Sequence, residues 1–154
     1  MIHGQIGGLH NVLARLEKSE FEFYPTGSRA VSLTPPADAD YDFFATASSQ
    51  IAKFLDKNGF KPLIEDAPFY PSSGDPEQEL HAIYRHLHYP VDVQLVENAE
   101  RKADIQETIR PVLEELYRED IPSDVRKLCV KYVWKAAFRT HREEKPLLGF
   151  WKKS

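Results

Sequence analysis

Two short segments of this chain alternate carboxylates with apolar side chains, and this alternation limits what they can form. They read Asp40-Tyr41-Asp42-Phe43 and Val91-Asp92-Val93-Gln94-Leu95-Val96. Successive side chains of a strand point to opposite faces, so each segment can pack one face against a core and present carboxylates on the other. Because aspartate is disfavoured in strands, these carboxylates indicate a function rather than a folding role.

The pattern of the remaining residues places these two strands among helices. Apolar periodicity predicts helices over 9–18, 48–58, 99–117 and 124–142 and strands over 21–24, 40–46 and 60–64. Pro25 is expected to halt the strand at 21–24, and a loop is expected over 67–76. Segments 80–86 and 91–96, joined through Tyr89-Pro90, predict an antiparallel hairpin.

The two C-terminal helices each show an apolar stripe. We expect Ile105, Ile109, Val112, Leu113 and Leu116 to face inward on the first, and Val125, Leu128, Cys129, Tyr132, Val133 and Ala136 on the second. The fold class predicted is α+β, with a small mixed β-sheet, flanking helices and a two-helix C-terminal segment. A length of 154 residues fits a single domain over 1–154, with a core over about 8–97 and the C-terminal helices over about 98–145.

Charge and cysteine content narrow the function classes. The net charge of −4 excludes a global field that would collect nucleic acid, and the single cysteine, Cys129, excludes an internal disulfide. The longest stretch without charged residues, 1–14, has the composition of neither a membrane span nor a secretion signal. We therefore expect a cytoplasmic protein with no membrane partner.

A glycine–serine pair precedes the first carboxylate segment at a specific spacing. Gly27-Ser28 is followed by the eleven residues 29–39 and then by Asp40-Tyr41-Asp42-Phe43. Together with Asp92 on a later strand, this order resembles the signature of the nucleotidyltransferase superfamily that includes polymerase beta. The resemblance covers residues 21–96, and compact stand-alone members of that superfamily are similar to this chain in size.

The resemblance implies a fold, a reaction and a set of site residues. Residues 8–97 would form a nucleotidyltransferase core that moves a nucleoside monophosphate from an NTP, with ATP expected as the commonest donor, to a hydroxyl acceptor and releases pyrophosphate. Asp40, Asp42 and Asp92 would be catalytic and would hold two Mg²⁺ or Mn²⁺ ions, for which carboxylate oxygens are suitable ligands. Gly27, Ser28 and Arg29 would bind the nucleotide. The acceptor stays open between a protein, a small molecule and an RNA end.

The three aspartates could also have a structural role without catalysis. Asp40 and Asp42 could belong to an acidic turn, and Asp92 could be an exposed position on a half-buried hairpin. A non-catalytic binding module of the same fold, which holds a nucleotide, RNA or protein partner, is the alternative function. A metal-dependent hydrolase or nuclease is a third class, although Gly-Ser before the aspartates favours a triphosphate ligand over it.

Other polar groups have weaker signals. His81, His86 and His88 suggest zinc, but no thiol or third ligand stands near them at a standard spacing. Arg85 precedes Asp92 and could contact a phosphate, with a solvated side chain as the default. On the last helix, basic residues recur every three or four positions, which forms either a solvated face or a contact for a polyanion such as RNA. These residues are Lys127, Lys131, Lys135, Arg139 and Arg142.

Overall fold

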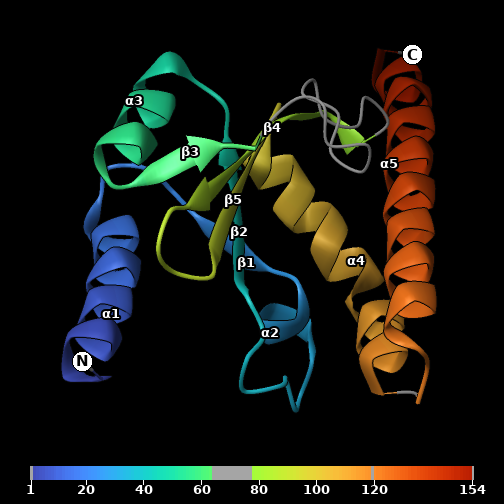
Figure 1. The fold of residues 1–154 in the computed structure, drawn as a ribbon. Helices are drawn as coiled ribbons and strands as arrows, with labels where there is room; N and C mark the ends of the chain where they lie inside the picture. The colour runs from blue at the N-terminus through green and yellow to red at the C-terminus, as the bar shows by residue number, and fades with distance from the viewer. Residues whose placement is uncertain (1, 64–77, 119, 154) are drawn as a thin grey trace.

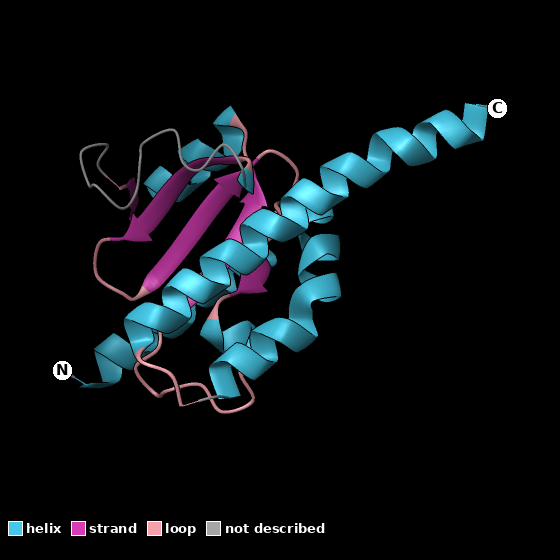
Figure 2. Ribbon diagram, turned by 90° about the vertical axis from the view of Figure 1, so that its right-hand side faces the viewer, coloured by secondary structure: helices cyan, strands magenta, loops and turns pink. Residues whose placement is uncertain are grey.

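A computed structural model of the chain describes residues 2–63, 78–118 and 120–153, and the side chains of 8–63, 78–118 and 120–143. The predicted α+β class is confirmed: five strands form one mixed sheet, and helices lie on both of its faces (Figures 1 and 2). Helices α1 (Ile2–Lys18) and α3 (Ser49–Lys57) cover one face, and α4 (Ala99–Arg118) and α5 (Ser123–Lys153) lie on the other. The short α2 (Ser28–Val31) follows the first strand.

The sheet has the strand order β1-β2-β5-β4-β3. Its members are β1 (Tyr24–Thr26), β2 (Tyr41–Thr46), β3 (Phe60–Pro62), β4 (Leu80–His86) and β5 (Val91–Val96). The central pair β2 and β5 is parallel, whereas β1 pairs with β2, and β4 with β5 and β3, in antiparallel fashion. The predicted hairpin of β4 and β5 is therefore confirmed.

The first strand differs from its prediction. The strand expected over 21–24 lies instead at Tyr24–Thr26 and contains Pro25, which was expected to end it. β1 is an edge strand of the sheet, where a proline without an N–H costs no ladder hydrogen bond. Phe21 and Phe23 instead pack around Phe54 of α3, with ring centroids 5.4 and 6.2 Å from its ring.

Local signals in the middle of the chain fix α3 as expected. Ser48 is the N-cap, and its side chain accepts a hydrogen bond from the Ile51 backbone N–H at 3.1 Å. Gly59 follows the helix with φ +86°, a conformation that glycine adopts without strain. Of the strand expected over 60–64, residues 60–62 form β3. Residue 64 and the loop expected over 67–76 lie outside the described residues.

Most of the apolar core lies on the α1 and α3 side of the sheet. Val91, Val93 and Leu95 point to this face and are 0%, 0% and 4% exposed. They pack with Val12 and Leu16 of α1 and with Ile51 and Leu55 of α3. Asp92 and Gln94 point to the opposite face, because side chains alternate along β5.

The helix that follows on the other face is oriented differently from the prediction. The apolar stripe expected on α5 is wrong for Val125, Leu128 and Tyr132, which are 44%, 53% and 61% exposed, and for Ala136, which is also exposed. Trp134 and Phe138 are the buried residues, packed with Ile105 and Leu113 of α4. Val112 of α4, also expected to face inward, is 49% exposed. A helix with two apolar stripes can bury only one of them against a single neighbour, and periodicity does not choose between them.

Within the described ranges, the structure has no helix that combines the length and the apolar character needed to cross a membrane.

Candidate metal and nucleotide site

Three carboxylates meet on the sheet face that carries α4 and α5. Asp42 and Asp92 are direct neighbours in the parallel register of β2 and β5, and Asp40 comes immediately before β2. Each of the three offers one carboxylate oxygen, and these oxygens lie within 4.8 Å of one another. Tyr41 and Phe43 point to the opposite face and pack against its core. The alternation in the sequence therefore gathers the three predicted carboxylates.

This arrangement shifts the pKa values of two of the carboxyl groups upward. Burial, followed by the charges of Asp92 and Asp40, raises the pKa of Asp42 from its ordinary value of 3.8 to about 7. Burial also raises the pKa of Asp92, against the opposing effect of the Arg85 guanidinium. Three close like charges that are partly removed from water favour either a proton or a cation between them.

Arg85, for which a solvated side chain was the default expectation, lies next to the three aspartates. In the antiparallel register of β4 and β5 it stands opposite Asp92. Its Nη1 donates hydrogen bonds to both carboxylate oxygens of Asp92 at 3.0 and 2.9 Å and to Asp40 at 3.5 Å. This contact could have been predicted from the sequence, because a hairpin that turns through residues 87–90 pairs positions 85 and 92.

Gly27 lies against Asp42 in a way that no other residue type could. Its φ is +73°, and a Cβ placed on it would contact the Asp42 carboxylate, with Cγ only 3.2 Å away. Ser28 begins α2 directly after it. Thr26, the residue directly before Gly27 and Ser28, is 7% exposed. Its hydroxyl donates a hydrogen bond to Oε1 of Gln106 at 2.6 Å, which anchors this part of the chain to α4. The structure thus brings Gly27-Ser28 beside the carboxylates.

Arg29 is engaged with the loop that leads to Asp40. Its Nε donates to the carbonyl of Ala39 at 2.8 Å, and its Nη2 donates to the carbonyl of Ala37 at 2.9 Å. The guanidinium also lies 4.1 Å from the ring centroid of Tyr41. These contacts make Arg29 a positioning residue for the entry to β2.

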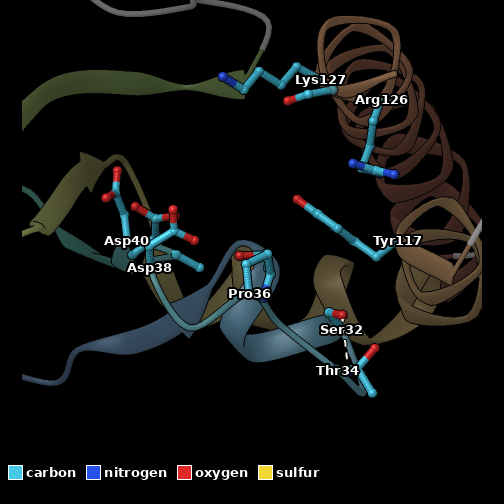
Figure 3. A pocket seen from close by; sticks show the side chains of 12 residues that line it. Ser32, Thr34, Pro36, Asp38, Asp40, Tyr117, Arg126 and Lys127 are labelled. Atoms are coloured by element: carbon cyan, nitrogen blue, oxygen red, sulfur yellow. Dashed lines mark hydrogen bonds between the residues drawn. The ribbon is translucent and has the colours of Figure 1, made fainter. Parts of the chain in front are cut away.

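A cavity of about 590 Å³ opens in front of the carboxylates. Asp38 and Asp40 stand on one side of it, and Tyr117, Arg126 and Lys127 stand across from them on α4 and α5 (Figure 3). The hydroxyl-bearing residues Ser28, Ser32, Thr34 and Ser123 complete its polar lining. The cavity therefore brings hydroxyl groups and two cationic side chains together with the carboxylates of Asp40 and Asp42.

The donor set fits hard divalent cations. The three ligands are carboxylate oxygens on two strands of one sheet, the ligand type that Mg²⁺ and Mn²⁺ prefer. A cation there would also offset the repulsion that raises the pKa of Asp42. We therefore regard Asp40, Asp42 and Asp92 as the residues that would hold such an ion.

The histidines occupy other positions. His81 forms an exposed ion pair with Glu97, with Nε2 2.5 Å from Oε2. His86 is 8% exposed and packs edge-on against Phe60, with ring centroids 5.0 Å apart. Among the described residues, the one group of side chains with metal-ligand geometry is the three aspartates.

The basic residues of α5 do not all lie on one solvated face. Lys127 and Lys131 line a cavity on the sheet side of the helix, and Arg142 pairs with Glu79 at 3.5 Å. Lys127 and Lys131 are nevertheless exposed, as a solvated face predicts, whereas Arg142 is partly buried in its ion pair.

Comparison of the chain with protein-family models, with curated proteins and with solved structures gave no match. The function proposed below is therefore inferred from the residues of the site and their geometry.

Proposed function

We propose that this protein is a metal-dependent nucleotidyltransferase, which moves a nucleoside monophosphate from an NTP to a hydroxyl acceptor and releases pyrophosphate. The observation that carries the proposal is the proximity of Asp40, Asp42 and Asp92 to one another and to Gly27-Ser28, at a cavity that Ser28, Asp40 and Asp42 line. The sequence order of these groups resembles the nucleotidyltransferase signature, and their proximity in space is what that reaction requires.

The polar groups of the cavity suit a triphosphate. Ser28, Ser32 and Thr34 carry hydroxyl groups that can donate hydrogen bonds to phosphate oxygens, and Arg126 and Lys127 supply positive charge on the opposite wall. Gly27 lets the chain pass close to the carboxylates without a side chain in the way. A triphosphate in this cavity would have its α-phosphate next to Asp40 and Asp42.

Divalent cations held by the three aspartates would stabilise the charge that develops on the attacking and leaving oxygens. The acceptor oxygen forms a bond to the α-phosphorus, the bond from that phosphorus to its bridging oxygen breaks, and pyrophosphate leaves with the electron pair. Asp92 would take the hydroxyl proton, a role consistent with the upward shift of its pKa. Arg85 would hold the Asp92 carboxylate in position.

The test compares two positions of the label in the donor. The protein is incubated with cell extract, Mg²⁺ or Mn²⁺, and each NTP labelled either at the α- or at the γ-phosphate. We expect α-label in the acceptor and γ-label in pyrophosphate. Asp42→Asn should lower transfer about 100-fold or more, because it removes a carboxylate from the reacting centre. Asp38→Asn, at an exposed carboxylate of the same cavity, is the matched control.

Other results would replace the proposal. Transfer that persists in Asp42→Asn, or transfer of the γ-label to the acceptor, would refute it. Metal-dependent NTP binding without any transfer would favour the alternative, a non-catalytic binding module of the same fold. Release of inorganic phosphate or cleavage of nucleic acid that depends on Asp42 would favour a hydrolase or nuclease.

A further inference from the structure

A second cavity, of about 640 Å³, adjoins the carboxylates on the same face of the sheet. It shares Asp42, Tyr117 and Lys127 with the first cavity, so the two meet at the site. Its other lining residues come from β1, β5, α4 and α5, together with Gly27 and Gln78. The proposed reaction leaves this space without a role.

Two polar side chains that line this cavity are held in a fixed relation. Lys102 of α4 is 3% exposed, and its Nζ donates a hydrogen bond to Oε1 of Gln94 at 2.9 Å. The ammonium also lies 5.1 and 4.9 Å from the ring centroids of Phe44 and Trp134. Since an ammonium group only donates hydrogen bonds, the amide of Gln94 must turn its oxygen toward Lys102 and its Nε2 away from it.

Gln94 therefore offers a donor to any ligand in the cavity. Among the described residues, its amide has no hydrogen bond besides the one from Lys102. Its Oε1 is already bound, which leaves the Nε2 hydrogens as the groups available to a ligand. A ligand atom at this position must be a hydrogen-bond acceptor.

The remaining walls suit a flat apolar ring. Leu128, Val130 and Trp134 line the cavity, and Leu128 is a large apolar side chain with 53% of its surface exposed. Gln94 lies two residues beyond Asp92 on the same sheet face, about 7 Å further along the strand. A nucleotide with its α-phosphate at the carboxylates would have to place its base away from them, and this cavity lies in that direction.

On the basis of the proposed function, we propose that this second cavity holds the base of the donor nucleotide and selects oxo bases, guanine and uracil, over adenine and cytosine. A glutamine that reads adenine accepts from the N6 amino group and donates to N7. Here the accepting atom of Gln94 is bound by Lys102, so only the donating half is available. Guanine O6 and uracil O4 accept such a hydrogen bond, whereas the amino groups of adenine and cytosine would face another donor.

This preference differs from ATP, which sequence analysis favoured only on abundance. The test measures the affinity of the full chain with Mg²⁺ for the α,β-methylene analogues of the four NTPs, which bind without transfer. We expect the GTP and UTP analogues to bind about tenfold more tightly than those of ATP and CTP. Inorganic tripolyphosphate should compete with all four analogues and show the same inhibition constant against each.

Two variants at the cavity test the cause. In Gln94→Glu, one carboxylate oxygen stays with Lys102 and the other accepts, so the order of preference should reverse. In Lys102→Met, which replaces the ammonium by an apolar group of similar length, Gln94 can present either amide atom and the four affinities should become equal. Gln50→Glu, at an exposed amide of α3 on the other face of the sheet, should keep the wild-type order.

The outcomes separate the inference from the proposed function. Equal affinities in the wild type, or an unchanged order in a folded Gln94→Glu variant, would overturn the base selection and leave the transferase proposal standing. Absence of any metal-dependent binding, of tripolyphosphate as well as of the analogues, would overturn both. Circular dichroism of each variant shows whether it is folded.

Discussion

Replacement of Asp42 by asparagine should make the metal-free protein more stable at alkaline pH. The carboxylate is partly removed from water and stands beside two other carboxylates, which raises its pKa from 3.8 to about 7 in the folded chain. The folded state therefore favours the protonated form more than the unfolded state does. It follows that stability is highest when Asp42 is protonated and falls as the pH rises from about 4 to about 7.

The size of this effect follows from the pKa difference. A difference of about 3 pH units corresponds to roughly 4 kcal/mol at pH values above 7, of which about 3 kcal/mol is lost between pH 5 and pH 8. This is an upper bound, because the carboxylate faces a cavity that is open to solvent and the folded site can relax. Asparagine has nearly the same shape and carries no charge, so the variant should lack this loss.

Urea denaturation in the presence of EDTA, at pH 5 and pH 8, measures the free energy of unfolding. We expect Asp42→Asn to exceed the wild type at pH 8 by at least about 1 kcal/mol and to show a smaller difference at pH 5. The exposed Asp38→Asn should follow the wild type at both values. Addition of Mg²⁺ should raise the stability of the wild type and leave that of Asp42→Asn nearly unchanged.

Lower stability of Asp42→Asn than of the wild type at pH 8 without metal, or the same dependence of stability on pH, would contradict this prediction. Either result would mean that the carboxylate is well solvated or well paired in the folded chain, and that its charge imposes no cost that a cation would relieve.

Three further changes probe the same site. Gly27→Ala should lower stability by about 1–3 kcal/mol and abolish the Mg²⁺-induced rise in Tm, because its Cβ would contact Asp42. Gly59→Ala, at a glycine that also has a positive φ but whose Cβ would contact His86 instead of a carboxylate, should lose stability but keep the metal response. Arg85→Gln should shift the Mg²⁺ midpoint to lower concentration in a Tm titration, since it removes a cation that competes for the carboxylates, and a higher midpoint would contradict this. Arg29→Ala should speed proteolysis within residues 32–39 with little change in global stability, because the side chain holds the carbonyls of that loop; unchanged cleavage would show that the loop keeps its conformation without these contacts.

The sheet and the carboxylates could be predicted because each depends on strict alternation. Asp42 and Asp92 lie on one face of their strands as soon as these segments are strands, and the parallel pairing brings them side by side. The boundaries of β1 could not be predicted in the same way, because Pro25 is acceptable only once the strand is known to be at an edge. Strand order is a property of the whole sheet and leaves no local signal in the sequence.

The second cavity was missed because its key residue looks like an ordinary charged position on a helix. Lys102 lies three residues before Ile105 and three after Ala99, both buried, so it stands in the apolar stripe of α4. A lysine at a core position of an amphipathic helix departs from the usual pattern and indicates a buried polar contact. Its partner Gln94 occupies the polar face of β5, but only the packing of α4 on that face shows that the two meet.

The two faces of the sheet carry different kinds of residue: one buries the larger apolar cluster, and the other carries the three aspartates. The α1 and α3 face buries the aliphatic side chains of β5, and it contains no member of the carboxylate cluster among the described residues. On the other face, α4 covers Phe44 and Val96 but leaves Asp42 of β2 open to both cavities and Gln94 of β5 open to the second. An apolar residue at position 42 would fill this opening without the cost of a partly buried charge. A protein that needed only the fold would gain stability by that change, so the retained carboxylate is consistent with the proposal that Asp42 holds a cation.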